Sequence, residues 1–268
     1  MGLGFKSVGD GPHSIVALHG WLGDESAFEP ILDAVDLGAY TWILPAYRGY
    51  GISRDIAGSF TIDEVAGDCL ELLDRLGRER FSVVGHSMGG KAMLRMLSLA
   101  PGRIAAMIGV APVPAIPAAF DAEARALFER AARSPDARRQ IVDFSTGGRL
   151  PPPWIANVLR HSLRSALPEA VESYFRSWAD GDFHRDLPES DVPALVVLGA
   201  YDPSITADLV ASTWSVWFPA IEVEVLPECG HYPPNEAPLA LAARIGTFLG
   251  KVLPDASAQV TRSRRHDG

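Results

Sequence analysis

A serine flanked by glycines gives the strongest chemical signal in this chain. Residues 85–89 read Gly-His-Ser-Met-Gly, a G-x-S-x-G pattern between an apolar run at 81–84 and a run of helical spacing at 90–99. A sharp turn from strand to helix strains the serine backbone, and the glycines leave room for neighbouring backbone. The pattern predicts that Ser87 is a nucleophile at the carboxyl edge of a sheet and that the Met88 amide, at the helix N-terminus, stabilises an oxyanion.

A serine hydroxyl is a weak nucleophile near neutral pH, so it needs a base and a third group that orients that base. Among the seven histidines, His231 is the best candidate for the base. It follows the strand predicted at 221–226 and precedes the last predicted helix, which puts it at the same sheet edge as Ser87.

Asp202 is the predicted orienting acid. It follows the apolar run at 194–198 after only three residues, so it also lies at the carboxyl edge. The chain order Ser87, Asp202, His231 is the order found in hydrolases with this strand-turn-helix motif. The other possible position, after the preceding predicted strand, has no carboxylate before Asp121. Two further acids are more simply explained as loop and helix-surface residues, Asp191 and Asp208.

The elements that position these residues alternate between short apolar runs and longer segments of helical spacing. This rhythm predicts an α/β fold with a mostly parallel central sheet flanked by helices. The predicted strands are 15–18, 41–44, 81–84, 105–110, 194–198 and 221–226, with one more around 3–8. Further predicted helices are 62–76 and 237–249, the second ending before Gly250.

More than 80 residues separate the strands predicted at 105–110 and 194–198. This segment is interrupted by prolines and has helical stretches at 121–133, 154–165 and 168–179, which predicts a helical cap at 112–188. Charges of alternating sign over 121–139 predict a solvated helix face. The predicted core comprises 1–111 and 189–253, and a disordered tail is expected at 254–268. Because the candidate residues lie on both sides of the insertion, cap and core form one catalytic unit.

Composition restricts the partners of the protein. The 268 residues carry a formal net charge of −9, which disfavours nucleic acid and anionic membrane surfaces. No run of 18 apolar residues indicates a membrane span. Cys69 and Cys229 allow at most one disulfide and suggest no zinc site, so a reducing, cytoplasmic location is expected.

Taken together, the motifs resemble the α/β-hydrolase superfamily, in its capped serine hydrolase branch of esterases and lactonases, over about residues 4–251. The family's His-Gly turn is similar to His19-Gly20-Trp21, and the resemblance implies that the Trp21 amide is a second oxyanion donor. Residues 48–53 match the family's R-G-x-G-x-S loop, and His231 followed by Glu236 resembles its histidine loop. Ala46 departs from the family, which usually has aspartate there, so a loop-stabilising contact is in doubt.

The resemblance implies cleavage of a carboxylic ester, lactone or thioester through an acyl-enzyme on Ser87, with no metal and no cofactor. A serine nucleophile disfavours the epoxide hydrolase and haloalkane dehalogenase branches, whose alkyl-enzyme ester needs a carboxylate. Two alternatives stay open. One is a C–C bond hydrolase of vinylogous diketones, whose sequences often share S-M-G-G, and the other is a receptor-like binding module with residual hydrolysis.

Aromatic residues in the predicted cap suggest a small, apolar acyl substrate. Trp154 and Trp178 are the candidate substrate-binding residues, and Tyr174 and Phe175 are spaced to join them in the wall of a cleft. For any one of these four side chains, packing within the cap's own core is favoured over substrate contact, because buried aromatics mostly serve packing.

Overall fold

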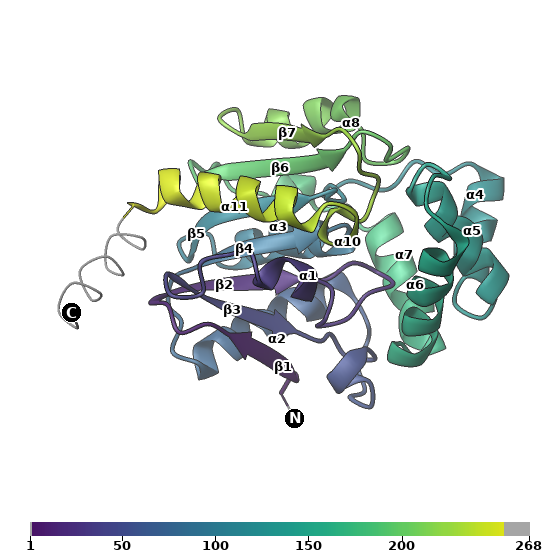
Figure 1. Cartoon of the computed structure of the whole chain (residues 1–268). Coiled ribbons are helices and arrows are strands. Elements are labelled where there is room, and N and C mark those ends of the chain that lie inside the picture. Colours follow the sequence, from purple (N-terminus) through teal and green to yellow (C-terminus); the bar gives the residue numbers. More distant parts are fainter. Residues whose placement is uncertain (1, 255–268) are drawn as a thin grey trace.

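The computed structural model describes residues 2–254 and has a seven-stranded sheet at its centre. The strand order is β1-β3-β2-β4-β5-β6-β7, and only β1 pairs antiparallel to its neighbour (Figure 1). The strands are β1 (Phe5–Val8), β2 (His13–Leu18), β3 (Tyr40–Pro45), β4 (Phe81–His86), β5 (Ile104–Val110), β6 (Ala194–Gly199) and β7 (Glu222–Leu226). All seven strands agree with the sequence prediction to within two residues at each end, which confirms the predicted fold class.

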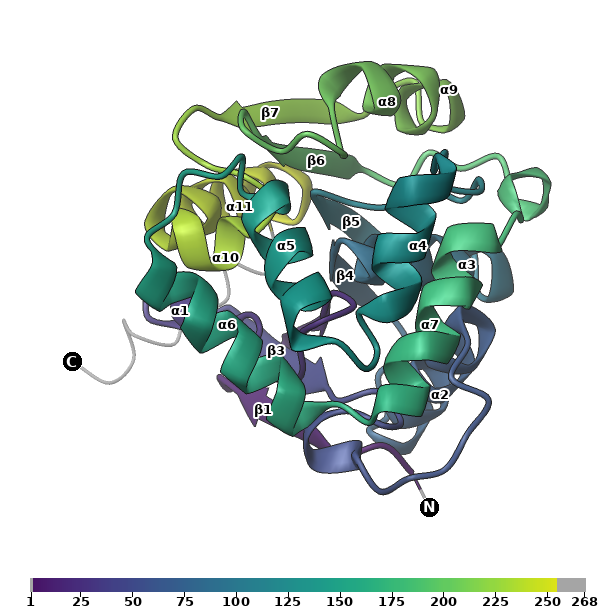
Figure 2. The same ribbon diagram turned by 90° about the vertical axis from the view of Figure 1, so that its right-hand side faces the viewer.

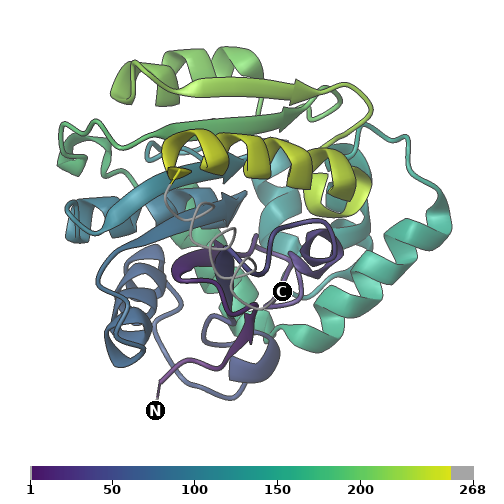
Figure 3. The ribbon, with the colours of Figure 1, turned by 60° about the vertical axis from the view of Figure 1, so that its left-hand side comes forward.

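Helices cover both faces of this sheet. One face packs against α1 (Glu29–Leu32) and α11 (Pro238–Val252), which crosses the sheet in Figure 3. The other packs against α2 (Ile62–Arg75) and α3 (Met88–Leu99), together with residues of α8 (Ala207–Ser212) and α9 (Trp214–Trp217). A short α10 (Pro233–Glu236) precedes α11, and three-residue 3-10 turns occur at Gly51–Ser53 and His184–Asp186.

Burial on both faces explains why the central strands are continuous apolar runs. In β2, Ile15 and Ala17 contact the core under α1 and α11, while Val16 and Leu18 contact the core under α2 and α3. Side chains alternate between the two faces along a strand, so every side chain of a strand that is covered on both faces is buried, and apolar residues are favoured at each position.

Residues 112–188, which we call the cap segment, leave the sheet after β5 and return before β6. They form α4 (Ala122–Arg130), α5 (Pro135–Ser145), α6 (Pro152–Ser165) and α7 (Pro168–Asp180). Figure 1 places these helices beyond the carboxyl edge of the sheet, and Figure 2 shows them from the front. Their apolar residues are continuous with the core under α2 and α3.

The structure corrects three details of the sequence prediction. The helix expected at 121–133 ends at Arg130, and the unpredicted α5 begins where the Ser134 hydroxyl accepts the Ala137 amide. Arg138 is not on a solvated face: it is buried and donates to the carbonyls of Ala131 and Ala132.

The last helix also differs from its prediction, because α11 continues through Gly250 to Val252. No helix within residues 2–254 is both long and apolar enough to cross a membrane. The tail predicted at 254–268 lies, apart from Pro254, outside the described residues.

Candidate active site

Ser87 occupies the turn between β4 and α3 in a strained conformation, with φ of 53° and ψ of −117°. A positive φ is costly for a residue with a side chain and persists only where the surroundings impose it. Two glycines make the turn possible. A Cβ at Gly85 would meet the Gly89 backbone, and a Cβ at Gly89 would collide with the backbone of Leu18. The sequence around Ser87 thus folds into the predicted strand-turn-helix.

Three loops bring the predicted nucleophile, base and acid into one hydrogen-bonded chain. The Ser87 hydroxyl lies 2.9 Å from His231 Nε2, and His231 Nδ1 donates to Asp202 Oδ2 over 2.6 Å. The second carboxylate oxygen of Asp202 accepts the amides of Ser204 and Ile205, which fixes its orientation. Because a carboxylate only accepts, Nδ1 of His231 carries the proton and Nε2 is free to accept one.

The same contacts set the charges of the pair. Burial lowers the pKa of His231, but the charge and hydrogen bond of Asp202 outweigh it, so the net pKa lies above its usual value. Burial raises the pKa of Asp202, yet His231 and two amide donors lower it overall. Asp202 is therefore ionised beside a histidine that is ready to become a cation. Asp191 and Asp208 are exposed and take no part in this chain.

His86 supports the base from the residue before the nucleophile. Its Nε2 donates to the His231 carbonyl over 2.7 Å, and the two rings lie 5.3 Å apart. Burial, with a contribution from nearby His231, lowers the pKa of His86 to about 3. His86 therefore stays neutral and holds the His231 loop without adding a competing charge.

Glu236 holds the loop on both sides of His231. Its two carboxylate oxygens accept the amide N–H groups of Gly230, over 2.8 Å, and Tyr232, over 2.9 Å. Arg149 from the cap segment donates to the same carboxylate over 2.7 Å, and the Glu236 side chain is only 1% exposed. A buried carboxylate with this many donors forms a rigid support.

The cap segment makes two more contacts with this loop. The His231 amide donates to the Ser145 carbonyl over 3.0 Å, and Arg149 also donates to the Glu228 carbonyl over 2.9 Å. The base loop is thus packed between the core and the end of α5.

The two predicted oxyanion donors lie on segments that are held in place. Met88 is the first residue of α3, so its N–H has no acceptor within the helix. Trp21 Nε1 donates to the Val171 carbonyl of α7, and the Trp21 carbonyl accepts the Tyr50 hydroxyl over 2.8 Å. Within residues 2–254 the Trp21 amide has no hydrogen-bond partner.

The departure at Ala46 leaves the neighbouring loop stable. Ala46 is buried and its amide donates to the Gly4 carbonyl. Two residues later, Arg48 forms a bidentate pair with Asp68 of α2, at 2.7 and 2.8 Å. This pair and the hydrogen bond from the Tyr50 hydroxyl to the Trp21 carbonyl stabilise the loop without an aspartate at position 46.

A cavity of about 710 Å³ opens above Ser87. Trp154 and Trp178, the two predicted substrate residues, both line it, whereas Tyr174 and Phe175 do not. Tyr174 packs in the core against the rings of Tyr50 and Phe60, so for it the packing explanation is right.

Several cavity residues were not predicted from the sequence. Phe120 and Phe128 join Trp21 and Trp178 in an aromatic wall whose ring centroids lie 4.8 to 5.9 Å apart. Other unpredicted residues of the lining include Asp24, Phe144, Asn157, His161 and Tyr232. Positions 154, 157, 158 and 161 share one face of α6. Their spacing in the sequence could therefore have predicted that Asn157 and His161 line the cavity together with Trp154.

Lys91 anchors the cap segment from beneath. Its side chain is fully buried, and Nζ donates to the carbonyls of Ile116, Trp178 and Gly181 over 2.9, 2.8 and 2.5 Å. Burial lowers the pKa of Lys91 to about 8. One ammonium on α3 therefore holds both ends of the insertion.

Comparison with known proteins agrees with this architecture. A family model described as the alpha/beta hydrolase fold matches residues 14–238. The chain is 30% identical to the dihydrolipoyllysine-residue acetyltransferase component of an acetoin cleaving system from Pseudomonas putida, over 92% of this chain but only 66% of that relative. It is 25% identical to the pimeloyl-[acyl-carrier protein] methyl ester esterase of Nitrosomonas europaea, over 85% of this chain and 92% of the esterase.

A thermophilic esterase from Thermogutta terrifontis is similar in structure, with a TM-score of 0.78, 26% identity and 93% of each chain covered. The family model spans most of the sequence, including the turn at Ser87 and the loops that carry Asp202 and His231. The chain therefore belongs to the α/β-hydrolase family.

Proposed function

We propose that the protein cleaves a carboxylic ester, lactone or thioester through an acyl-enzyme on Ser87. The observation that carries this proposal is the hydrogen-bonded chain from Asp202 through His231 to Ser87, which ends in an open cavity. The cycle needs only these side chains, two backbone amides and water.

In the first half of the cycle, His231 Nε2 takes the hydroxyl proton as Ser87 Oγ attacks the substrate carbonyl. The Trp21 and Met88 amides donate to the oxyanion of the tetrahedral intermediate. Asp202 stabilises the imidazolium that forms. His231 then gives its proton to the leaving group, and the acyl group remains on Ser87.

In the second half, water takes the place of the leaving group. His231 accepts a proton from this water, which attacks the acyl carbonyl. The same two amides bind the second oxyanion, and His231 returns the proton to Ser87 as the acid product leaves. The apolar wall of Trp21, Phe128 and Trp178 suits an apolar acyl group.

Two other functions remain alternatives: a C–C bond hydrolase of vinylogous diketones and a receptor-like binding module. One observation weighs against the C–C bond hydrolase. The two relatives above that the chain covers almost in full are a methyl ester esterase and a thermophilic esterase, which favours ester over C–C cleavage. A receptor-like module with residual hydrolysis would use the same three residues but complete few cycles. The predicted partition into a core (1–111 and 189–253) and a cap (112–188), and the cytoplasmic location, remain part of the proposal.

Labelling with a fluorophosphonate and a kinetic screen test the function. We expect the probe to label the protein and Ser87→Ala to abolish both labelling and turnover of short-chain and medium-chain esters. Ser98→Ala, on the same helix but bonded only to the Leu94 carbonyl, is the matched control and should keep both. Labelling that survives Ser87→Ala would overturn the nucleophile assignment.

The same screen separates the alternatives. It should include lactones, thioesters and one vinylogous diketone at equal concentrations. Faster turnover of the diketone than of every ester would favour C–C cleavage. Release of one equivalent of product per protein, with no further cycles, would favour the receptor-like module.

A further inference from the structure

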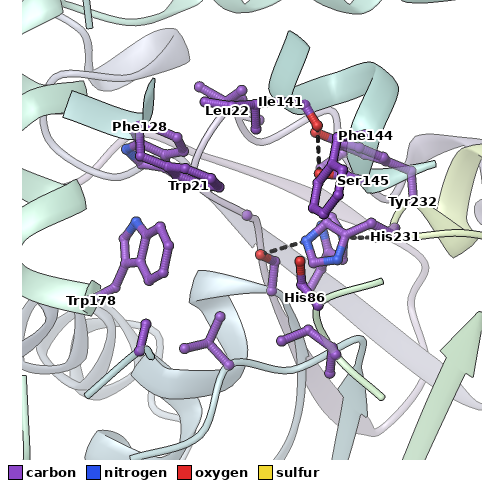
Figure 4. A pocket seen from close by; sticks show the side chains of 18 of the residues that line it. Trp21, Leu22, His86, Phe128, Ile141, Phe144, Ser145, Trp178, His231 and Tyr232 are labelled. Atoms are coloured by element: carbon purple, nitrogen blue, oxygen red, sulfur yellow. Dashed lines mark hydrogen bonds between the residues drawn. The ribbon is translucent and has the colours of Figure 1, made fainter. Parts of the chain in front are cut away.

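The cavity has two chemically different walls. Figure 4 shows Trp21, Phe128 and Trp178 across the cavity from His231 and Tyr232. In the proposed cycle, His231 protonates the leaving group, so the leaving group must lie on the side of His231. The acyl group then lies against the aromatic wall on the opposite side.

Helix α6 forms much of the wall on the leaving-group side. The Trp154 ring lies 5.7 Å from the Tyr232 ring, which joins α6 to the base loop. Asn157 and His161 line the cavity from the same helix face as Trp154, because they follow it by three and seven residues. Figure 2 shows α6 on one side of the cap segment and α4 and α7 on the opposite side.

This side of the cavity is polar. Asn235 of α10 lines it together with Asn157 and His161, and both asparagines are exposed at its opening. His161 Nε2 lies 2.8 Å from Asp24 Oδ2, and the other Asp24 oxygen accepts the amide and hydroxyl of Ser26. Asp24 is thereby held by partners on both of its carboxylate oxygens.

His161 keeps one ring nitrogen for a ligand. Its Nδ1 has no hydrogen-bond partner among residues 2–254, and its side chain is 41% exposed. The hydrogen bond and charge of Asp24, with Glu25 adding to them, raise the pKa of His161 against the opposing effects of burial and Arg164. The protonated ring, which carries N–H on both nitrogens, is therefore favoured, and His161, which lines the cavity, then has in Nδ1 a donor that Asp24 does not use.

We propose that the natural substrate joins an apolar acyl group to a leaving group that carries a carbonyl or carboxylate oxygen, and that His161 is the residue that selects this oxygen. The inference rests on the proposed acyl-enzyme function. A cavity of about 710 Å³ has room for both arms of such a substrate.

Three hexanoate esters test the inference. Their alcohols are 1-pentanol, 5-hydroxypentanamide and 5-hydroxypentanoate, whose substituents are too far from the ester to change its intrinsic reactivity. We expect kcat/KM to be at least about fivefold higher for the amide or the carboxylate than for the pentyl ester. His161→Leu should remove this preference, and His161→Gln, which keeps an N–H donor, should restore part of it.

His184→Leu is the matched control, because His184 also pairs with an aspartate, Asp182, but does not line the cavity. It should leave the ratio between the esters unchanged. Asn157→Leu gives a second test that keeps the His161 pair intact, and it should lower the same ratio. Thermal melts of each variant check that it is folded.

Two failures are distinguishable. If the esters are turned over but the wild-type protein shows no preference, or His161→Leu keeps it, the inference is wrong and the proposed function stands. If none of the three esters is cleaved and the fluorophosphonate does not label Ser87, the proposed function fails, and the inference fails with it.

Discussion

Arg149 of the cap segment donates to Glu236 over 2.7 Å, and Glu236 accepts the two amides that flank His231. The cap thus supports the base from outside the substrate cavity, since neither Arg149 nor Glu236 lines it. We assign both residues a positioning role, because they act on the reaction through the backbone of His231.

Arg149→Met should lower kcat several-fold to about tenfold with little change in KM, because His231 loses part of its support while the cavity lining is intact. Glu236→Gln should have a similar effect, and the double variant should lose less than the product of the two single losses, since both changes remove one contact. Arg133→Met, which removes a longer surface pair with Glu172, is the control. Strictly multiplicative effects would contradict the shared role.

Asp202→Asn should lower kcat by about 10³ to 10⁴-fold, because the amide favours the wrong tautomer of His231. Steady-state kinetics on the best ester of the screen measures the loss. Asp208→Asn, an exposed neighbour on α8, should behave like wild type. Near-normal turnover of Asp202→Asn would move the acid role to another residue.

The pH dependence of kcat/KM should report His231. The ring must be neutral to accept the Ser87 proton, and its pKa is raised, so activity should fall with decreasing pH from a midpoint above the ordinary value of 6.5. Asp202→Asn removes the main cause of the rise and should move the midpoint to lower pH. A wild-type midpoint below 6.5 would contradict the charge pairing.

Lys91→Met should destabilise the protein by about 2 to 4 kcal/mol, because three buried carbonyls lose their donor. Chemical denaturation measures the change in the free energy of unfolding. Lys251→Met, which removes an exposed pair with Glu222, should change it by no more than about 0.5 kcal/mol. Equal stability of the two variants would show that the Lys91 contacts contribute little.

The sheet and the three residues at its edge were predictable because local signals specify them. Strands such as β4 and β6 are buried on both faces, so they appear as short continuous apolar runs. Ser87 and Asp202 follow such runs, and His231 follows the edge strand β7, in which apolar and charged residues alternate. These strands are parallel, so they end at one edge of the sheet.

The lining of the cavity was not predictable in the same way. Phe128 belongs to α4, which has no buried residue, and it meets Trp21 only because α4 packs against the loop after β2. Arg138 lies among alternating charges that look solvated, yet the carbonyls at the end of α4 bind it. Such contacts depend on how the helices of the cap pack together, which periodicity in one segment cannot specify.

The contacts of Lys91 also determine how the protein tolerates insertions and deletions in residues 112–188. It fixes the points where residues 112–188 leave and rejoin the core, at Ile116 on one side and Trp178 and Gly181 on the other. With both junctions fixed, insertions or deletions between them cost mainly loop-closure entropy, which grows slowly with length. Apart from the contacts that Ser145 and Arg149 make with the His231 loop, the interior of the cap is therefore free to diverge while the sheet edge beneath it keeps its geometry, so substrate preference can change without a change in the catalytic residues.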